Sequence, residues 1–250
     1  MKEKIYTIPV NDAFAESSIC PICSLKNQLN SQLGAYYLGA SLMEPDVRKT
    51  TNEKGFCGDH LDQLYHSEMN RLGLGLMLHT YLSGLSDELK VDLRNSLPGR
   101  RTGVFQNRKK DFRQVLKQAA KKLQARTDTC VICDRISQTM NRYLEVIFHE
   151  YFANPVFRGH FDQVKTFCLP HTAWMLNGAA DHLNQDQVAV MMGALVETQI
   201  SSLEKLTQDV EWFTLKFDYR NHDKDWKDSK DAIPRSITRL KGSTSGKGSD

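Results

Sequence analysis

Apolar residues recur at helical spacing through most of this chain, and very little of it reads as strand. In the segment 24–43 one stripe gathers Leu25, Leu29, Leu33, Tyr36, Tyr37 and Ala40. In the segment 134–153 a similar stripe gathers Ile136, Met140, Tyr143, Leu144 and Ile147. Each stripe stops before a proline, Pro45 or Pro155, as expected because proline disfavours helical backbone in the residue before it. We predict a long helix in each segment.

The same spacing predicts further helices over 60–71, 74–96, 171–180 and 185–217. It also predicts a basic amphipathic helix over 105–126, whose inward face is formed by Phe105, Phe112, Leu116, Ala119 and Leu123. Residues 97–104 read as a break, and 221–231 as a solvated segment. A short terminal helix fits 232–242, and the polar tail 243–250 has the composition of a disordered segment. The predicted fold class is therefore all-α.

All six cysteines of the chain fall into one pattern that occurs twice. A Cys-x-x-Cys pair is followed, after a long helical segment, by Phe-Cys-x-x-His. The first occurrence supplies Cys20, Cys23, Cys57 and His60, and the second supplies Cys130, Cys133, Cys168 and His171. The offset between the occurrences is 110 residues at the first pair and 111 at the second. The chain therefore contains an internal repeat built around three thiols and an imidazole.

Three cysteines and one histidine form the ligand set of a closed tetrahedral zinc site. We therefore predict two zinc ions per chain, one stapling each repeat, with all eight residues as metal ligands. An iron–sulfur cluster is the competing metal centre, because thiolates also hold such clusters. Without a metal, the cysteines would form disulfides or stay as buried apolar thiols. Sharing of ligands between the repeats stays open.

The chain can close each set within its own repeat if the segment after the long helix is extended. A helix of about 20 residues carries the chain about 30 Å away from its Cys-x-x-Cys pair. The roughly 13 residues before the next cysteine span about 40 Å when extended. On this basis Cys57 is expected to return to Cys20 and Cys23. The next helices then begin around Cys57 and Cys168, where Pro170 suits a first helical turn.

The amino-acid composition limits the class of protein and the compartment in which we expect it. The 250 residues are 40% hydrophobic and 25% charged, which is ordinary for a soluble globular protein. The N-terminus lacks the apolar core of a signal peptide, and no apolar run is long enough for a membrane span. We therefore expect a cytoplasmic protein, whose thiols stay reduced.

The positive charge is concentrated in one segment. Arg100 to Arg126 holds ten Lys or Arg residues and a single acid, Asp111, so it carries +9 of a chain whose net charge is +3. Four regions are predicted on this basis: a first repeat at 1–97, a basic linker helix at 98–126, a second repeat at 127–220 and a mobile C-terminal segment at 221–250.

The twin motifs "CPIC … FCGDH" and "CVIC … FCLPH", with helices between them and a final "PRSITRLKG", resemble a family of bacterial proteins of about this length. That family is described only as a domain of unknown function. The resemblance covers most of the chain and implies a helical, metal-binding bacterial protein, and it implies no activity. One departure is that Pro21 of the first pair is replaced by Val131 in the second.

These observations favour a zinc-binding helical scaffold or interaction protein whose metal is structural. Four ligands per set leave no open position for a catalytic water. No phosphate loop, nucleophile elbow or zinc-protease motif is present, so we predict no enzymatic activity. Two competing hypotheses are a thiol or zinc redox sensor, and a nucleic-acid-binding protein that uses the basic segment. The scaffold hypothesis allows a protein partner, which the sequence does not identify.

Overall fold

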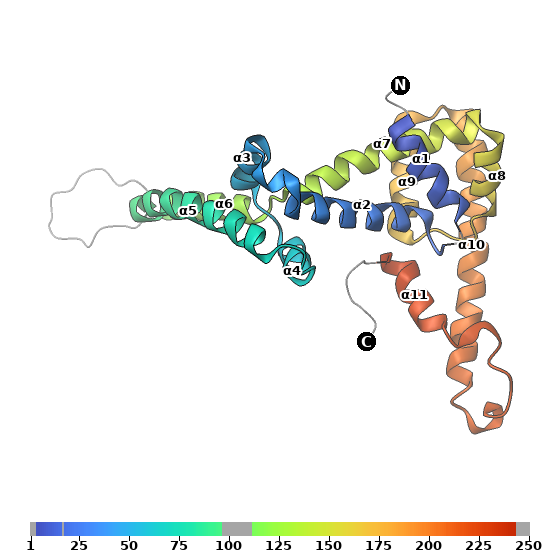
Figure 1. Ribbon diagram of the computed structural model, residues 1–250. Coiled ribbons are helices and arrows are strands. Elements are labelled where there is room, and N and C mark those ends of the chain that lie inside the picture. The colour runs from blue at the N-terminus through green and yellow to red at the C-terminus, as the bar shows by residue number, and fades with distance from the viewer. Residues whose placement is uncertain (1–3, 17, 97–111, 244–250) are drawn as a thin grey trace. The chain divides into compact units, whose positions relative to one another are not determined.

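The computed structural model of the protein describes residues 4–16, 18–96 and 112–243. Every regular element in these ranges is helical, which confirms the predicted all-α class (Figure 1). The α-helices are α1 (Lys4–Ala15), α2 (Pro21–Leu38), α3 (Pro45–Lys54), α4 (Gly58–His66), α5 (Arg71–Ser96), α6 (Phe112–Thr127), α7 (Val131–Ala153), α8 (Pro155–Gln163), α9 (Leu169–His182), α10 (Gln185–Leu215) and α11 (Ala232–Lys241). Three short 3-10 helices are η1 (Ala40–Met43), η2 (Tyr219–Asn221) and η3 (Lys227–Ser229).

Most of the strongly periodic segments are helices as predicted, although the helix expected over 60–71 ends at His66. The segments expected to be extended contain helices as well. The predicted long helices correspond to α2 and α7, and the prolines that end their patterns each start a new helix. Pro45 and Pro155 occupy the first turns of α3 and α8, where the missing proline N–H costs nothing. The Asn154 side chain accepts hydrogen bonds from the N–H groups of Val156 and Phe157. The expected extended return after each long helix is therefore wrong.

The chain forms two compact units that differ from the four regions suggested by the sequence. Unit 1 comprises Met1–Leu29 and Gln138–Asp250, and unit 2 comprises Asn30–Ser137. Both α2 and α7 therefore contribute residues to each unit. The order of helices after each Cys-x-x-Cys pair is the same in both halves of the chain: a long helix, a short helix, a helix beginning at Cys-x-x-His and another long helix. The repeat relation itself stays a prediction.

Unit 1 has an aromatic core between α1, α8 and the segment before α9. The ring of Phe14 lies 5.0 Å from that of Phe157, 5.6 Å from that of Phe161 and 6.2 Å from that of Phe167 (centroid distances). All four side chains are buried. Burial of such large rings is the main stabilising contribution to a core of this kind. It also holds the segment before α9 against α1.

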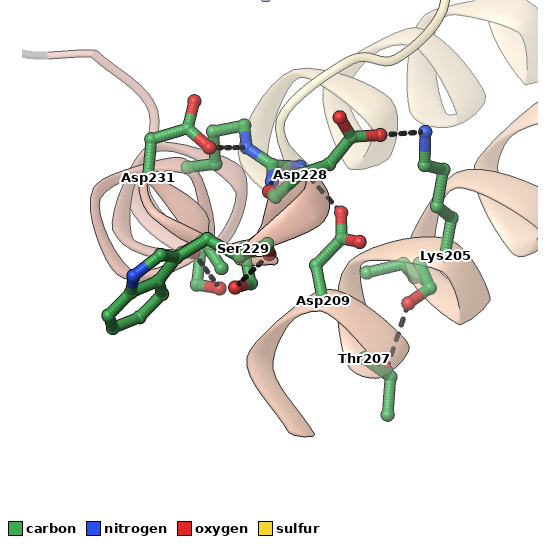
Figure 2. Close-up of polar contacts among 11 residues, drawn as sticks. Lys205, Thr207, Asp209, Asp228, Ser229 and Asp231 are labelled. Atoms are coloured by element: carbon green, nitrogen blue, oxygen red, sulfur yellow. Dashed lines mark hydrogen bonds and ion pairs between the residues drawn. The ribbon is translucent and has the colours of Figure 1, made fainter. Parts of the chain in front are cut away.

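The C-terminal helix α11 is held to α10 by a network of ion pairs. Arg235 of α11 donates to Asp209 at 3.0 Å and to Asp231 at 2.9 Å. Lys205 of α10 pairs with Asp228 at 2.9 Å. Figure 2 shows Asp209, Asp228 and Asp231 converging on this region beside Lys205. Because Asp209 and Arg235 are largely covered, their pair is worth more than an exposed one.

Unit 2 places the end of α3 against the start of α7. The N–H of Val131 donates to the carbonyl oxygen of Gly55 at 3.1 Å, and the Thr129 hydroxyl donates to the carbonyl oxygen of Lys54 at 2.6 Å. Lys54 also pairs with Asp134. These bonds bring two segments far apart in sequence to one place. Helices α5 and α6 lie side by side in the same unit (Figure 1).

Candidate metal centres

The eight predicted ligands form two groups, and each group lies within one unit. Cluster 1, in unit 1, consists of Cys20, Cys23, Cys168 and His171. Cluster 2, in unit 2, consists of Cys57, His60, Cys130 and Cys133. In each cluster the four ligand atoms lie within 4.8 Å of one another. All six cysteines are free thiols, so the disulfides considered from the sequence are not realised in this structure.

Cluster 1 is assembled at the starts of two helices. Cys20 directly precedes α2 and Cys23 lies in its first turn, whereas Cys168 is the N-cap of α9 and His171 lies in its first turn. The Cys23 Sγ atom is 3.6 Å from Cys168 Sγ, and Cys20 Sγ is 3.9 Å from it. The His171 Nδ1 atom is 3.6 Å, 3.4 Å and 3.1 Å from the sulfurs of Cys20, Cys23 and Cys168.

Cluster 2 repeats this arrangement with the helices α4 and α7. Cys57 is the N-cap of α4, and Cys130 directly precedes α7. The Cys57 and Cys133 sulfurs are 3.7 Å apart. The His60 Nδ1 atom lies 3.1 Å, 3.3 Å and 3.4 Å from the sulfurs of Cys57, Cys130 and Cys133.

These separations match the edges of a tetrahedron around one ion. Zinc–sulfur bonds of about 2.3 Å and zinc–nitrogen bonds of about 2.0 Å place two sulfurs about 3.8 Å apart, and a sulfur and a nitrogen about 3.5 Å apart. A cluster of several irons has a larger body, which would hold the thiolates further apart than a single ion does. The donor set and its spacing therefore fit one tetrahedral ion per cluster.

The grouping of the ligands corrects the one predicted from the sequence. Cys20 and Cys23 meet Cys168 and His171 rather than Cys57 and His60, so each cluster draws one motif from each half of the chain. Ligands from the two halves of the chain are therefore shared, an arrangement that the sequence left open.

Helix geometry explains this exchange. The 18 residues of α2 carry the chain about 27 Å from Cys20. The expected return fails because α3 takes up 10 of the following residues, and a helix of that length advances only about 15 Å. Cys57 consequently stays near the far end of α2, where the start of α7 supplies Cys130 and Cys133. In the second half of the chain, α7 and α8 separate Cys168 from Cys130 and Cys133 in the same way. Cys168 therefore meets Cys20 and Cys23.

An outer hydrogen bond orients the histidine of cluster 2. The Nε2–H of His60 donates to Asn30 Oδ1 at 2.9 Å, and the Asn30 amide donates in turn to Gln63 Oε1 at 2.8 Å. This bond places a proton on Nε2, so Nδ1 is the ring nitrogen that faces the three sulfurs and would bind a metal ion. Such second partners fix the tautomer and orientation of metal-binding histidines. Asn30 was not among the predicted functional residues, since it lies in the polar positions of a helix with no distinguishing motif.

The pKa shifts of the ligand side chains indicate that both clusters favour positive charge. Burial by itself would lower the pKa of His171, but hydrogen bonds and charges from Cys168 and Cys23 outweigh it and raise the pKa to about 9. In cluster 2, burial opposes ionisation of Cys130, yet the hydrogen bond from His60 and further bonds lower its pKa to about 6. Burial and the neighbouring Cys130 raise the pKa of Cys133 to about 12. Crowded thiols thus resist ionising together, and a divalent cation relieves that repulsion.

The two clusters differ in how well they are covered. All three cysteines of cluster 1 are buried and His171 is half-buried. In cluster 2, Cys130 and His60 are buried, Cys57 is half-buried and Cys133 is exposed. Solvent and dissolved reagents therefore reach a ligand of cluster 2 directly.

The end of α11 completes the cover over cluster 1. The N–H of Ser243 donates to Cys23 Sγ at 3.4 Å, and Asn27 donates to the Ser243 hydroxyl at 3.4 Å. Gly242 has φ 83° and ψ 167°, a conformation that is almost exclusive to glycine. A Cβ at Gly242 would lie 3.5 Å from the sulfurs of both Cys23 and Cys168. The predicted terminal helix is present, but its role at the cluster was not predicted.

A family model described as a family of unknown function (DUF6062) matches residues 1–247. The chain belongs to this family. The resemblance seen in the motifs is thereby confirmed, and the match spans both clusters and α11. No curated protein and no solved structure matches the chain.

The basic segment is described only in part. Helix α6 begins at Phe112, and Phe105, which was predicted on its inward face, lies outside the described residues. Phe112 is 48% exposed and Leu116 is 39% exposed, so their predicted inward orientation is wrong, whereas Ala119 is buried as expected. Arg126 pairs with Glu88 of α5 and donates to the carbonyl oxygen of Glu53, which uses part of the basic charge within unit 2.

No helix in the described ranges is both long enough and apolar enough to cross a membrane.

Proposed function

We propose that this protein is a zinc-binding helical scaffold or interaction protein in which both metal ions are structural. The proposal rests on one observation: in each cluster the ligand atoms of three cysteines and one histidine lie within 4.8 Å of one another. A catalytic zinc keeps one position open for water or substrate, and a set of three thiolates and one imidazole leaves none. On this basis we propose that the protein is not an enzyme.

Each ion would join the starts of two helices that are remote in sequence. In cluster 1 it would connect α2 to α9, and in cluster 2 it would connect α4 to α7. Zinc binding at such sites is coupled to folding and contributes about 10–16 kcal/mol to small zinc domains. The helical units would therefore depend on metal for their stability, which suits a scaffold that presents helix surfaces to a partner. We place it in the cytoplasm, where thiols remain reduced.

Exposed apolar side chains support a protein partner. Tyr65, Met69, Leu72 and Leu76 are all exposed at the end of α4 and the start of α5. Leu72 and Leu76 are one helical turn apart and so share a face.

Metal analysis of the purified full chain tests the proposal. We expect about two zinc ions per chain, released on denaturation, together with a thermal midpoint that falls when the metal is removed by chelation. A coloured, iron-containing protein would refute the zinc assignment. Protein that keeps the same midpoint after complete metal removal would refute the structural role.

A thiol or zinc redox sensor is the second candidate, and the exposure of Cys133 in cluster 2 favours it. Oxidation of an accessible zinc thiolate releases the ion, because a disulfide is a poor ligand. In that case the scaffold would be regulated through unit 2. Retention of both ions after mild peroxide treatment would exclude this function.

Nucleic-acid binding through 100–126 rests on charge alone. Phosphate contacts would make any affinity fall steeply with salt. We propose only weak, sequence-independent binding through this segment, with dissociation constants no tighter than about 10⁻⁶ M at physiological salt. A salt titration with duplex DNA tests this, and tighter sequence-selective binding would contradict it.

A further inference from the structure

Unit 1 contains a cavity of about 590 Å³ that is separate from the ligand atoms of cluster 1. Its walls come from the end of α1 and the loop after it, from the end of α8, from the middle of α10 and from α11. Cavities of this size are typical of sites for small organic molecules.

The floor of the cavity combines apolar side chains with a buried cation. Phe14, Leu206 and Arg239 line it and are all buried. Val164 and Ile19 extend the apolar wall toward the solvent, and the exposed Lys165 stands at the rim. An arginine at 3% exposure is unusual, because burying an unpaired charge is costly.

Arg239 is only partly satisfied by the protein. Its Nη2 atom donates to the carbonyl oxygen of Gln199 at 3.3 Å and to the Ser202 hydroxyl at 3.1 Å. Its Nε and Nη1 atoms are buried and have no hydrogen-bond partner among the described residues. Burial lowers the pKa of Arg239, and the sulfurs of Cys168 and Cys20, when ionised, oppose this through their charge. No hydrogen bond joins these sulfurs to the guanidinium within the described part of the chain. Three N–H donors of the guanidinium are thus unused.

A second unused polar group lines the same cavity. The Ser18 hydroxyl is buried without a partner among the described residues. Buried polar groups are nearly always hydrogen-bonded, and each exception calls for a bound partner or a function. Two such exceptions at one cavity therefore indicate a ligand that supplies oxygen acceptors.

The other cations of the cavity do not need a ligand. Arg235 is paired with Asp209 and Asp231, and Lys205 is paired with Asp228 (Figure 2). This leaves Arg239 and Lys165 as the cations of the lining without an acidic partner among the described residues, against one acidic lining residue, Glu16. The electrostatic balance at the floor therefore favours an anion.

We infer that this cavity binds a small organic carboxylate, whose oxygens accept hydrogen bonds from Arg239 and Ser18 and whose apolar body packs against Phe14 and Leu206. An arginine is well suited to this task, because its donors match carboxylate geometry and its charge strengthens the bonds. None of the eight metal-ligand residues lines the cavity, so the carboxylate would bind beside cluster 1 without replacing one of its ligands.

Binding of three probes to the metal-loaded full chain tests the inference. The probes are para-fluorophenylacetate, the neutral para-fluorophenethyl alcohol and inorganic phosphate, followed by fluorine NMR and calorimetry. We expect the carboxylate to bind with a millimolar or tighter dissociation constant, and at least about tenfold more tightly than the alcohol. Equal affinity for acid and alcohol, or no binding of the acid, would overturn the inference. Displacement of the acid by an equal concentration of phosphate would overturn the choice of carboxylate.

Variants locate the site. Arg239→Gln should weaken the carboxylate about tenfold or more and leave the alcohol unchanged. Arg158→Gln, an exposed arginine of unit 1 outside the cavity lining, is the matched control and should have no effect. Because Arg239→Gln removes bonds to α10 and could fail to fold, Ser18→Ala provides the second variant. It removes no bond present in the described structure and should weaken the carboxylate about threefold.

An unchanged affinity in Ser18→Ala together with an unchanged affinity in any folded Arg239→Gln sample would overturn the assignment. Zinc content measured in the same samples separates this result from loss of metal.

Discussion

Cluster 1 and cluster 2 hold the same four ligand types at nearly the same spacings, yet their surroundings differ. Cluster 1 has three buried thiols and is covered by the end of α11, which supplies the Ser243 N–H. Cluster 2 has an exposed ligand, Cys133, and relies on Asn30 to orient its histidine. From this comparison we expect that the ligand residues set which ion can bind, whereas their burial determines how easily a bound ion is lost.

The largest expected effect comes from removing ligands in pairs. Cys20→Ser combined with Cys168→Ser should remove one ion and leave about one zinc per chain, because both residues belong to cluster 1. Cys20→Ser combined with Cys57→Ser should remove both ions. Metal analysis and thermal melting distinguish the two double variants. The grouping within each repeat gives the reverse result, so a higher zinc content in the second variant would disprove the exchanged clusters.

The second-largest effect is expected when the hydrogen bond that orients His60 in cluster 2 is removed. Asn30→Ala removes the acceptor of the His60 Nε2–H and should lower zinc affinity of cluster 2 about 10- to 100-fold. Cluster 1 should be unaffected. Competition with a chromophoric chelator measures both sites in one titration. Asn27→Ala serves as the control, since Asn27 lies on the same helix and contacts Ser243 beside cluster 1. Equal losses from both clusters would contradict the assigned role of Asn30.

A smaller effect is expected on the rate at which oxidation releases the ion from each cluster. Under limiting peroxide, cluster 2 should release its ion at least about tenfold faster than cluster 1, because reaction of a thiolate requires access. Mass spectrometry should find Cys133 oxidised first. Zinc release is followed with a metal indicator, and Cys133→Ser, already without that ion, should lack the fast phase. Simultaneous release from both clusters would show that cover does not control reactivity.

The smallest expected effect concerns the cover of cluster 1. Gly242→Ala places a side chain in a conformation reserved for glycine and should destabilise unit 1 by about 1–3 kcal/mol. Gly55, which ends α3 with φ 65°, gives a useful comparison, because an added Cβ would approach the Tyr81 ring to 2.8 Å. Gly55→Ala should therefore cost more. Gly159→Ala, in the middle of α8 with open space around it, is the control and should be neutral or slightly stabilising.

These substitutions are compared by denaturant unfolding with metal bound. A Gly242→Ala protein as stable as the wild type would show that Gly242 does not need its glycine-specific conformation to place the end of α11 over cluster 1.

The residues of the candidate sites could be named from the sequence alone. Every cysteine belongs to a duplicated pattern that ends in Cys-x-x-His, and this chemistry is local: two ligands one turn apart on a helix are close in any fold. The all-α fold class could also be predicted from the sequence, since the apolar stripes of α2, α7 and α10 are long and regular. The helices α1, α3 and α8 escaped prediction, because all three are short, α1 contains Pro9 and α3 is almost wholly polar.

The pairing of the motifs was decided by tertiary structure. Spacing along the chain allowed Cys57 to return to Cys20, and only the helical state of α3 prevents that return by shortening the reach of the segment. The same holds for the cover of cluster 1, because Gly242 and Cys23 are joined by packing of α11 and by no signal in sequence. Local patterns thus determined which atoms can bind a metal, while the rigidity and length of helices determined which of those atoms meet.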